Sequence, residues 1–234
     1  MVLAAGLGTR MRPLTDTRPK ALVEVAGKAL IDHTLDRLEA VGVERAVVNV
    51  HAFADQMEAH LARRTSPQIL ISDERGGLLE TGGGIKRART LLGEGPIWVA
   101  NSDYVWLDQA DGGLAEVARR WDADAMDACI VVIPKARTLG FDTPGDFFGD
   151  PEGALTPRGA AGEAPLHAFG LQILNPQPVY ATAAEAFSLR NVWFDAAARR
   201  RLIGVQPAGL WMQVGDPAAL DLAEARLAGR APPS

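Results

Sequence analysis

The sequence predicts an α/β fold: a single-domain, Rossmann-like three-layer sandwich with helices on both faces of a mostly parallel central sheet. Short apolar and β-branched runs alternate along the chain with amphipathic stretches, which is typical of such a sheet. The 234 residues suit one fair-sized domain. A composition of 47% hydrophobic and 23% charged residues is that of an ordinary globular protein and argues against disordered, collagen-like and coiled-coil classes.

The predicted strands are short apolar segments bounded by loops. In chain order they are residues 1–5, 45–50, 68–72, 97–100, 128–133, 168–174, 202–205 and 210–214, the first being very short. The predicted helices each align apolar side chains on one face, namely Ile31, Leu35 and Leu38, then Met57 and Leu61, then Ile85, Ala88 and Leu92, and finally Leu220, Ala223 and Leu227. Residues 143–165, rich in Gly and Pro, predict an irregular excursion or a hairpin. We place the domain at residues 1–230 and a frayed tail at 231–234.

Charge and cysteine content restrict the partners and the compartment. The net charge of −5 disfavours nucleic acid and anionic membrane as partners, so an anionic ligand needs a local positive site. Cys129, the single cysteine, lies in an apolar run and is expected to be a small buried hydrophobe in a reducing cytoplasm. No segment is typical of a signal peptide or a membrane span. We expect a cytoplasmic monomer or small homo-oligomer.

Ligands of open α/β sheets bind outside the carboxyl ends of the strands. Three loops that follow predicted strands therefore matter most, namely residues 6–20, 72–84 and 101–104. The first of them is long for a compact domain, which favours a functional role over a simple connection. The sequence thus predicts that these three loops meet around a ligand.

The first loop has the composition of an anion site. It reads Gly6-Leu7-Gly8-Thr9-Arg10-Met11-Arg12-Pro13-Leu14-Thr15 and continues to Arg18-Pro19-Lys20. Glycines let backbone N–H groups approach phosphate oxygens closely. Between residues 10 and 20 four positive side chains stand against Asp16 alone, which gives a local charge of +3.

Two well-known phosphate loops do not fit this segment. A dinucleotide fingerprint needs a small residue where the chain has Met11, and Pro13 blocks the helix that should open there. A P-loop needs Gly-Lys followed by Ser or Thr, whereas Gly27-Lys28 precedes Ala29. A dinucleotide-dependent oxidoreductase is therefore disfavoured.

The opening motif instead resembles that of the sugar-phosphate nucleotidyltransferases. The resemblance covers Leu3-Ala4-Ala5-Gly6-x-Gly8-Thr9-Arg10-x-x-Pro13-Leu14-Thr15, then Pro19-Lys20 and Val25-x-Gly27-x-x-Leu30. It implies a GT-A-like nucleotidyltransferase fold and two catalytic cations, Arg10 for the β- and γ-phosphates and Lys20 for the phosphates that react. The nucleotide-binding residues that it implies in this segment are Ala4, Ala5, Gly6, Gly8 and Thr9.

A second match follows the third predicted strand, in Leu79-Glu80-Thr81-Gly82-Gly83-Gly84. A glycine run alone indicates no more than a loop or a helix start. In the family that this chain resembles, the matching segment recognises the nucleobase, which implies nucleotide contacts from Glu80, Thr81 and Gly82. The segment is most similar to the uridylyltransferase branch that acts on N-acetylmuramate α-1-phosphate.

The expected metal site is Asp103, in Asn101-Ser102-Asp103 at the end of a predicted strand. A carboxylate there is well placed for Mg²⁺, although Asn, Ser and Asp also favour turns and caps. The resemblance implies that Asp103 binds Mg²⁺ and also contacts the sugar. Relatives commonly carry a second acidic ligand where this chain has Gln213, whose amide carbonyl can still reach Mg²⁺ but removes one negative charge.

The acceptor pocket is expected from more scattered matches. Gly145, Asp146, Gly170 and, more weakly, Asn191 resemble sugar-binding positions of relatives. Phe169 stands where relatives often have a small polar residue, so the shape of the pocket near it stays open.

Together these matches imply transfer of UMP from UTP to N-acetylmuramate α-1-phosphate, giving UDP-N-acetylmuramate and pyrophosphate in cell-wall sugar recycling. The expected cofactor is Mg²⁺, and the expected partners are UTP and a sugar 1-phosphate. Alternatives are glucose-1-phosphate uridylyl or thymidylyl transfer, mannose-1-phosphate guanylyl transfer, or a non-catalytic nucleotide-sugar binder, which Gln213 would suit.

Overall fold

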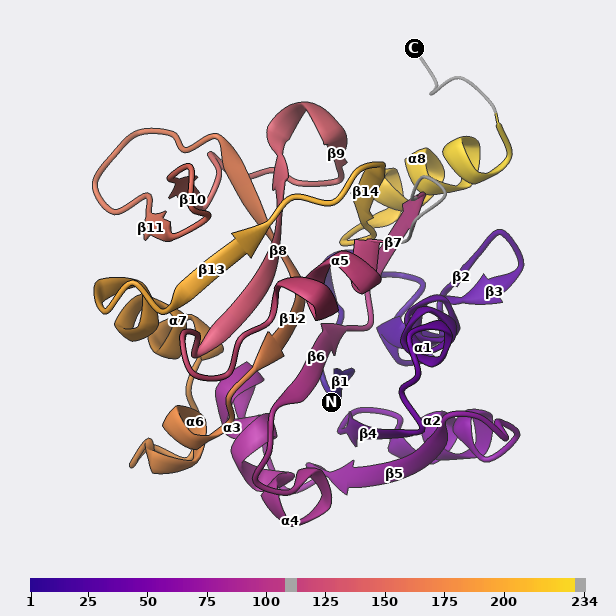
Figure 1. The fold of residues 1–234 in the computed structure, drawn as a ribbon. Coiled ribbons are helices and arrows are strands. Elements are labelled where there is room, and N and C mark those ends of the chain that lie inside the picture. The colour runs from indigo at the N-terminus through magenta and orange to yellow at the C-terminus, as the bar shows by residue number, and fades with distance from the viewer. Residues whose placement is uncertain (108–112, 230–234) are drawn as a thin grey trace.

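A nine-stranded sheet forms the centre of the computed structural model, which describes residues 1–107 and 113–229 (Figure 1). Seven of its strands follow the order β11-β10-β12-β6-β1-β4-β5, while β8 pairs with β12 and β13 with β8. The strands are β1 (Val2–Leu3), β4 (Arg45–Val50), β5 (Gln68–Asp73), β6 (Ile97–Asn101), β8 (Ala128–Pro134), β10 (Phe147–Gly149), β11 (Leu155–Pro157), β12 (Leu166–Leu174) and β13 (Leu202–Val205).

The sheet is mostly parallel, as predicted. Strands β6, β1, β4 and β5 run in one direction, and β13 runs parallel to β8. Strand β12 is antiparallel to both β6 and β8. It enters the sheet from the hairpin β10–β11 in the stretch predicted as an excursion or hairpin, and so needs no crossover helix.

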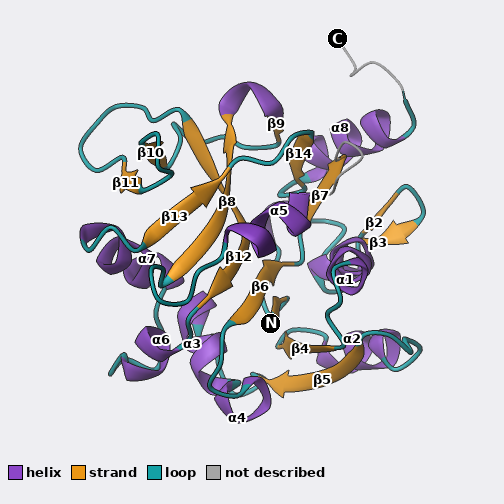
Figure 2. Ribbon diagram, in the orientation of Figure 1, coloured by secondary structure: helices purple, strands orange, loops and turns teal. Residues whose placement is uncertain are grey.

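The helices are α1 (Leu30–Ala40), α2 (Ala54–Leu61), α3 (Glu80–Arg87), α4 (Arg89–Leu92), α5 (Gly113–Arg120), α6 (Gln177–Ala181), α7 (Leu189–Ala198) and α8 (Pro217–Leu227). Short 3₁₀ turns lie at Thr9–Met11, Lys20–Leu22 and Lys135–Arg137. Figure 2 shows helices on both sides of the strands, which gives the three layers that the sequence predicts. Among the described residues, no helix has the length and apolar character needed to cross a bilayer.

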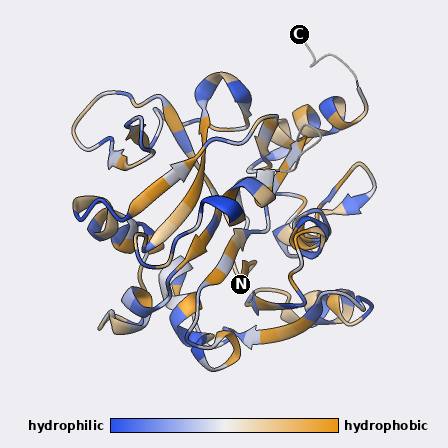
Figure 3. Ribbon diagram, viewed as in Figure 1, coloured by the Kyte–Doolittle hydropathy of each residue, from blue (hydrophilic) through white to orange (hydrophobic). Residues whose placement is uncertain are grey.

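Strand β8 shows why both faces of the sheet are covered. Cys129, Val131 and Ile133 belong to the core shared with α1, α2 and α5, whereas Ile130 and Val132 belong to the core shared with α3, α6 and α7. Alternate side chains point to opposite faces, so an apolar run without polar alternation must be buried on both. Figure 3 shows this apolar character along the central strands. Cys129 is a buried hydrophobe as expected, and burial raises the pKa of its thiol to about 12.

A second, three-stranded sheet lies beside the main one, in the order β7-β14-β9. Its strands are β7 (Tyr104–Leu107), β14 (Leu210–Gln213) and β9 (Thr138–Leu139), and a separate small hairpin joins β2 (Glu24–Val25) to β3 (Lys28–Ala29). The last predicted strand thus forms, but it pairs with β7 and β9 and not with the main sheet. This pairing carries the C-terminal part of the chain to the end of β6, where Asp103 lies. The predicted tail at 231–234 lies outside the described residues.

Candidate active site

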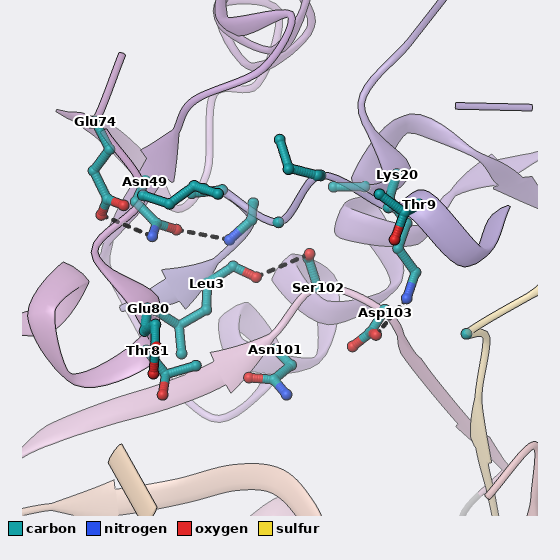
Figure 4. A pocket seen from close by; sticks show the side chains of 18 of the residues that line it. Leu3, Thr9, Lys20, Asn49, Glu74, Glu80, Thr81, Asn101, Ser102 and Asp103 are labelled. Atoms are coloured by element: carbon teal, nitrogen blue, oxygen red, sulfur yellow. Dashed lines mark hydrogen bonds and ion pairs between the residues drawn. The ribbon is translucent and has the colours of Figure 1, made fainter. Parts of the chain in front are cut away.

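Two cavities adjoin at the carboxyl ends of β1 and β6. The larger has a volume of about 480 Å³ and the smaller about 200 Å³, and Leu3, Thr81 and Asn101 line both. All three loops predicted to matter contribute to the larger cavity (Figure 4). The predicted residues that line the larger cavity are Ala4, Ala5, Gly6, Gly8, Thr9, Arg10, Lys20, Glu80, Thr81 and Asp103.

The first loop folds back on itself to present Lys20. Gly8 has a φ of 63° in the left-handed region, and a Cβ there would lie 2.9 Å from the Cβ of Lys20. The Thr15 hydroxyl donates to the Gly8 carbonyl at 2.8 Å and closes the loop. Glycine is therefore required at position 8 both by the backbone angle and by the close approach of Lys20.

Only part of the local positive charge faces the cavity. Arg10 and Lys20 line it, whereas Arg12 pairs on the surface with Asp16 at 3.3 Å and Arg18 is exposed outside the lining. Gly215, just after β14, lies against the guanidinium of Arg10, since a Cβ at this position would be 3.3 Å from Arg10 Nη2. The C-terminal part of the chain therefore helps to position the first cation.

Lys20 and Asp103 form an ion pair within the larger cavity. Lys20 Nζ donates to Asp103 Oδ2 at 2.6 Å, and the two side chains are only 15% and 17% exposed (Figure 4). Low exposure strengthens the attraction compared with a surface pair. The pair places one cation and one anion side by side in the lining of the cavity.

The donor set at Asp103 fits Mg²⁺. The metal prefers oxygen ligands and is often held by one or two carboxylates together with substrate phosphates. Among the described residues, no group of three or more His, Cys, Asp or Glu side chains is arranged to hold a metal by itself.

The backbone of Gln213 lies near that of Asp103. It pairs with Tyr104 in the β14–β7 ladder, and the following Val214 N–H donates to the Asp103 carbonyl at 2.9 Å. Gln213 is not among the residues that line either cavity. The second small sheet thus accounts for the proximity of positions 103 and 213, which are far apart in the sequence.

A buried polar chain forms the other end of the larger cavity (Figure 4). The Ala4 N–H donates to Asn49 Oδ1 at 2.7 Å, and Asn49 Nδ2 donates to Glu74 Oε1 at 2.9 Å. Glu74 is only 2% exposed, and this burial raises the pKa of its carboxyl. Sequence reasoning missed both residues, although a lone Asn within the apolar strand 45–50 is a signal that could have identified Asn49.

The glycine run owes its composition to close packing. A Cβ at Gly82 would lie 2.3 Å from the Phe187 ring, and one at Gly83 would lie 2.2 Å from the Glu185 carbonyl. Gly82 lies outside the lining of both cavities, and its N–H donates to the Phe187 carbonyl at 2.9 Å. The run lets residues 185–187 approach α3, which brings the start of α7 to the smaller cavity.

The smaller cavity is assembled from paired side chains. Trp193 Nε1 donates to Gln172 Oε1 at 2.8 Å, and Arg190 Nη1 donates to Asp146 Oδ1 at 2.9 Å. All four residues line the cavity, and sequence reasoning identified only Asp146 among them as sugar-binding. The Asn191 motif does lie on α7, but Asn191 itself is exposed and lines neither cavity.

Glycines shape the wall of the smaller cavity. Gly170 lines it at an irregularity in the β12–β8 pairing, and a Cβ there would lie 2.2 Å from Asn101 Nδ2. Gly145 lies outside both linings and packs against the Ala164 carbonyl at a φ of 88°. Phe169 is buried against Tyr104 and Trp211 and lines neither cavity, so this residue leaves the space beside Gly170 open.

The chain is similar in sequence and in fold to known nucleotidyltransferases. The model of the MobA-like NTP transferase domain matches residues 1–208. The chain is 54% identical over 232 residues to an N-acetylmuramate alpha-1-phosphate uridylyltransferase of Caulobacter vibrioides, covering 97% of this chain and 96% of the relative. It is 34% identical to the Neisseria meningitidis protein of the same name, covering 98% and 97%. A putative glucose-1-phosphate thymidylyltransferase of Bacillus anthracis has the same fold, with a TM-score of 0.78 at 13% identity over 96% and 93% of the two chains.

Proposed function

Because the chain belongs to the sugar-phosphate nucleotidyltransferases of the MobA-like NTP transferase family, we propose that it transfers UMP from UTP to N-acetylmuramate α-1-phosphate. The products are UDP-N-acetylmuramate and pyrophosphate. The observation that carries the proposal is the pair of adjoining cavities, one with Arg10, Lys20 and Asp103 and the other lined by polar pairs. The 54% identity to a protein named for this activity supports the choice of substrates.

In the proposed reaction a phosphate oxygen of the sugar phosphate attacks the α-phosphorus of UTP. A new P–O bond forms there, and the bond to the bridging oxygen breaks as pyrophosphate leaves. The chain then needs no nucleophile of its own, because aligning two anions and neutralising their charge lowers the barrier. Lys20 would exchange its bond to Asp103 for the reacting phosphates, and Arg10 would neutralise the departing pyrophosphate.

We propose Mg²⁺ as the cofactor, held by Asp103 with Gln213 beside it. The ion would supply Lewis-acid stabilisation of phosphate charge. Asp103 lines the larger cavity, and the β14–β7 ladder pairs Gln213, which lines neither cavity, with Tyr104, the residue after Asp103. Because the side chain at position 213 is a neutral amide, Asp103 would be the anionic protein ligand. The triphosphate oxygens would then supply most of the negative charge that binds the metal.

The nucleoside would occupy the end of the larger cavity that lies near Glu74, Glu80 and Thr81, and the sugar would enter the smaller cavity. Thr81 lines both cavities, so it lies at the proposed junction of donor and acceptor. The reaction would belong to recycling of peptidoglycan sugars in the cytoplasm, carried out by a monomer or small homo-oligomer.

A substrate panel tests this proposal. UTP, dTTP and GTP are each combined with the α-1-phosphates of N-acetylmuramate, glucose and mannose, with and without Mg²⁺, and pyrophosphate release is measured. We expect the highest kcat/KM for UTP with N-acetylmuramate α-1-phosphate, and only with Mg²⁺. Turnover confined to another pair would move the chain to the glucose or mannose branch. Binding of UTP or a UDP-sugar without turnover of any pair would identify a nucleotide-sugar binder.

A further inference from the structure

The smaller cavity contains one positive side chain among the described residues that line it. That residue is Arg190, the second residue of α7, and Asp146 is the one acidic residue in the same lining. The rest of the lining is apolar, hydroxyl, amide or aromatic. Asp146 occupies one of the five N–H donors of Arg190, and the donors that remain form stronger bonds to an anionic acceptor than to a neutral one.

Arg190 is held along one edge of its guanidinium. Nη1 donates to Asp146 Oδ1 at 2.9 Å, while Asp146 Oδ2 accepts the Ala168 N–H at 2.9 Å. The Arg190 Cζ lies 5.5 Å from the centroid of the Phe194 ring. Both oxygens of Asp146 are thus bonded within the protein, and the carboxylate acts as a fixed support for the guanidinium.

The other edge of the guanidinium is available to a ligand. An arginine has five N–H donors, and within residues 1–107 and 113–229 the one bonded acceptor of its side chain is Asp146. The side chain is 48% exposed, compared with 14% for Asp146. The planar fork of the guanidinium matches a carboxylate with two parallel bonds.

The backbone also fixes Arg190 relative to the nucleotide. The preceding Leu189 N–H donates to Thr81 Oγ1 at 2.8 Å, and Thr81 lines both cavities. The Gly82 and Gly83 N–H groups donate to the Phe187 carbonyl at 2.9 and 3.2 Å. These bonds tie the start of α7 to α3, so the distance from the nucleotide end to Arg190 is set by packed backbone and not by a loose loop.

N-acetylmuramate differs from N-acetylglucosamine by a lactyl ether that ends in a carboxylate. We propose that Arg190, supported by Asp146, binds this lactyl carboxylate and thereby selects N-acetylmuramate α-1-phosphate over N-acetylglucosamine α-1-phosphate. This inference rests on the proposed function and adds to it the residue that distinguishes the acceptors. Arg190 acts in specificity and does not contact the reacting phosphorus.

The test compares both acceptors in the wild type, Arg190→Gln and Arg190→Lys, with UTP and Mg²⁺. Arg190→Gln should lower kcat/KM for N-acetylmuramate α-1-phosphate by about 10- to 100-fold, the range for losing a hydrogen bond to a charged group. The loss for N-acetylglucosamine α-1-phosphate should be much smaller. Arg190→Lys keeps the charge without the fork and should fall between the wild type and Arg190→Gln.

The matched control is Arg200→Gln. Arg200 pairs with Asp150 at 2.7 Å, so its removal also breaks an arginine–aspartate pair, but it lines neither cavity. Arg200→Gln should not change the ratio of kcat/KM for N-acetylmuramate α-1-phosphate to kcat/KM for N-acetylglucosamine α-1-phosphate. Thermal unfolding of each variant verifies the fold, and titration calorimetry with each sugar phosphate gives the same comparison if the wild type does not turn over N-acetylglucosamine α-1-phosphate.

The outcomes separate the inference from the function on which it rests. No turnover of N-acetylmuramate α-1-phosphate by the wild type would overturn the proposed function. Normal wild-type turnover with an equal loss for both acceptors in Arg190→Gln would overturn only the role of Arg190. The role of Arg190 would also be overturned if the ratio of kcat/KM for the two acceptors stayed at the wild-type value in both Arg190→Lys and Arg190→Gln.

Discussion

The two cavities differ in how the chain builds their walls. The larger is lined chiefly by loops that leave the parallel strands β1, β5 and β6, and its charged residues lie within or just after those loops. The smaller is lined by pairs that join distant segments, Gln172 with Trp193 across 21 residues and Asp146 with Arg190 across 44. Backbone direction brings the groups of the larger cavity to the ends of the strands, where Lys20 then pairs with Asp103 across 83 residues. The pairs of the smaller cavity join segments that do not leave neighbouring parallel strands.

This difference has a functional consequence. Groups placed by loops at the strand ends can approach a triphosphate whatever acceptor is used, so their loss should slow every reaction. The paired groups line the smaller cavity, where the acceptor is proposed to bind. Their loss leaves the strands in place and should weaken binding of the acceptor alone. Three substitutions test that division, beginning with the largest expected effect.

Lys20→Ala should lower kcat by about 100-fold or more with every acceptor, because it removes electrostatic stabilisation from the reacting phosphates. Pyrophosphate release under saturating substrates measures the effect. Lys28→Ala is the control, because Lys28 pairs with Asp36 and lines neither cavity. A kcat equal to that of the wild type would remove Lys20 from the mechanism, and a loss confined to one acceptor would break the proposed division between the cavities.

Gln172→Leu should destabilise the fold by about 1–3 kcal/mol, because the largely buried Trp193 N–H loses its acceptor. We also expect a several-fold higher KM for the sugar phosphate and an unchanged KM for UTP. Denaturant unfolding and steady-state kinetics measure the two effects.

A double-mutant cycle with Trp193→Phe isolates the pair, since removing both partners costs less than the sum of the single losses. Gln177→Leu, at an exposed glutamine of α6, serves as the control. A raised KM for UTP in Gln172→Leu would show that the smaller cavity is not confined to the acceptor.

The same division explains what the sequence could predict. The three loops and the cluster of Arg10, Lys20 and Asp103 follow from contiguous patterns, as do seven strands of the main sheet, because a strand and the loop after it are encoded locally. Those strands are β1, β4, β5, β6, β8, β12 and β13. Arg190 gives no local signal, because its partner Asp146 lies 44 residues away in the sequence. Gln172 does give one, as a lone amide within the apolar strand 168–174, but that signal does not identify Trp193 as its partner. The position of Gln213 beside Asp103 likewise depends on the β14–β7 pairing, which sequence periodicity does not specify.

Glu74 tests which property decides the effect of a residue on the reaction. That property is either the cavity in which the residue lies or its placement by pairing with a distant side chain. It lies in the larger cavity, yet its partner Asn49 comes from another strand. Burial raises the pKa of Glu74, so the folded chain holds this proton more tightly than the unfolded chain. The stabilisation from protonated Glu74 is therefore fully present below its unfolded pKa of about 4.3 and is lost as pH rises through the folded pKa.

Glu74→Gln keeps an oxygen acceptor for Asn49 and removes this titration. We expect the variant to gain thermal stability relative to the wild type at pH 8, with a smaller gain at pH 5, because each unit of raised pKa is worth about 1.4 kcal/mol. Glu24→Gln, at an exposed carboxylate on β2, should show no such trend. A gain for Glu74→Gln that is equal at both pH values would mean that burial of charge is not the cause. The predicted trend, together with a kcat that stays within a few-fold of the wild type, would show that residues joined by pairing support the larger cavity without carrying out its chemistry.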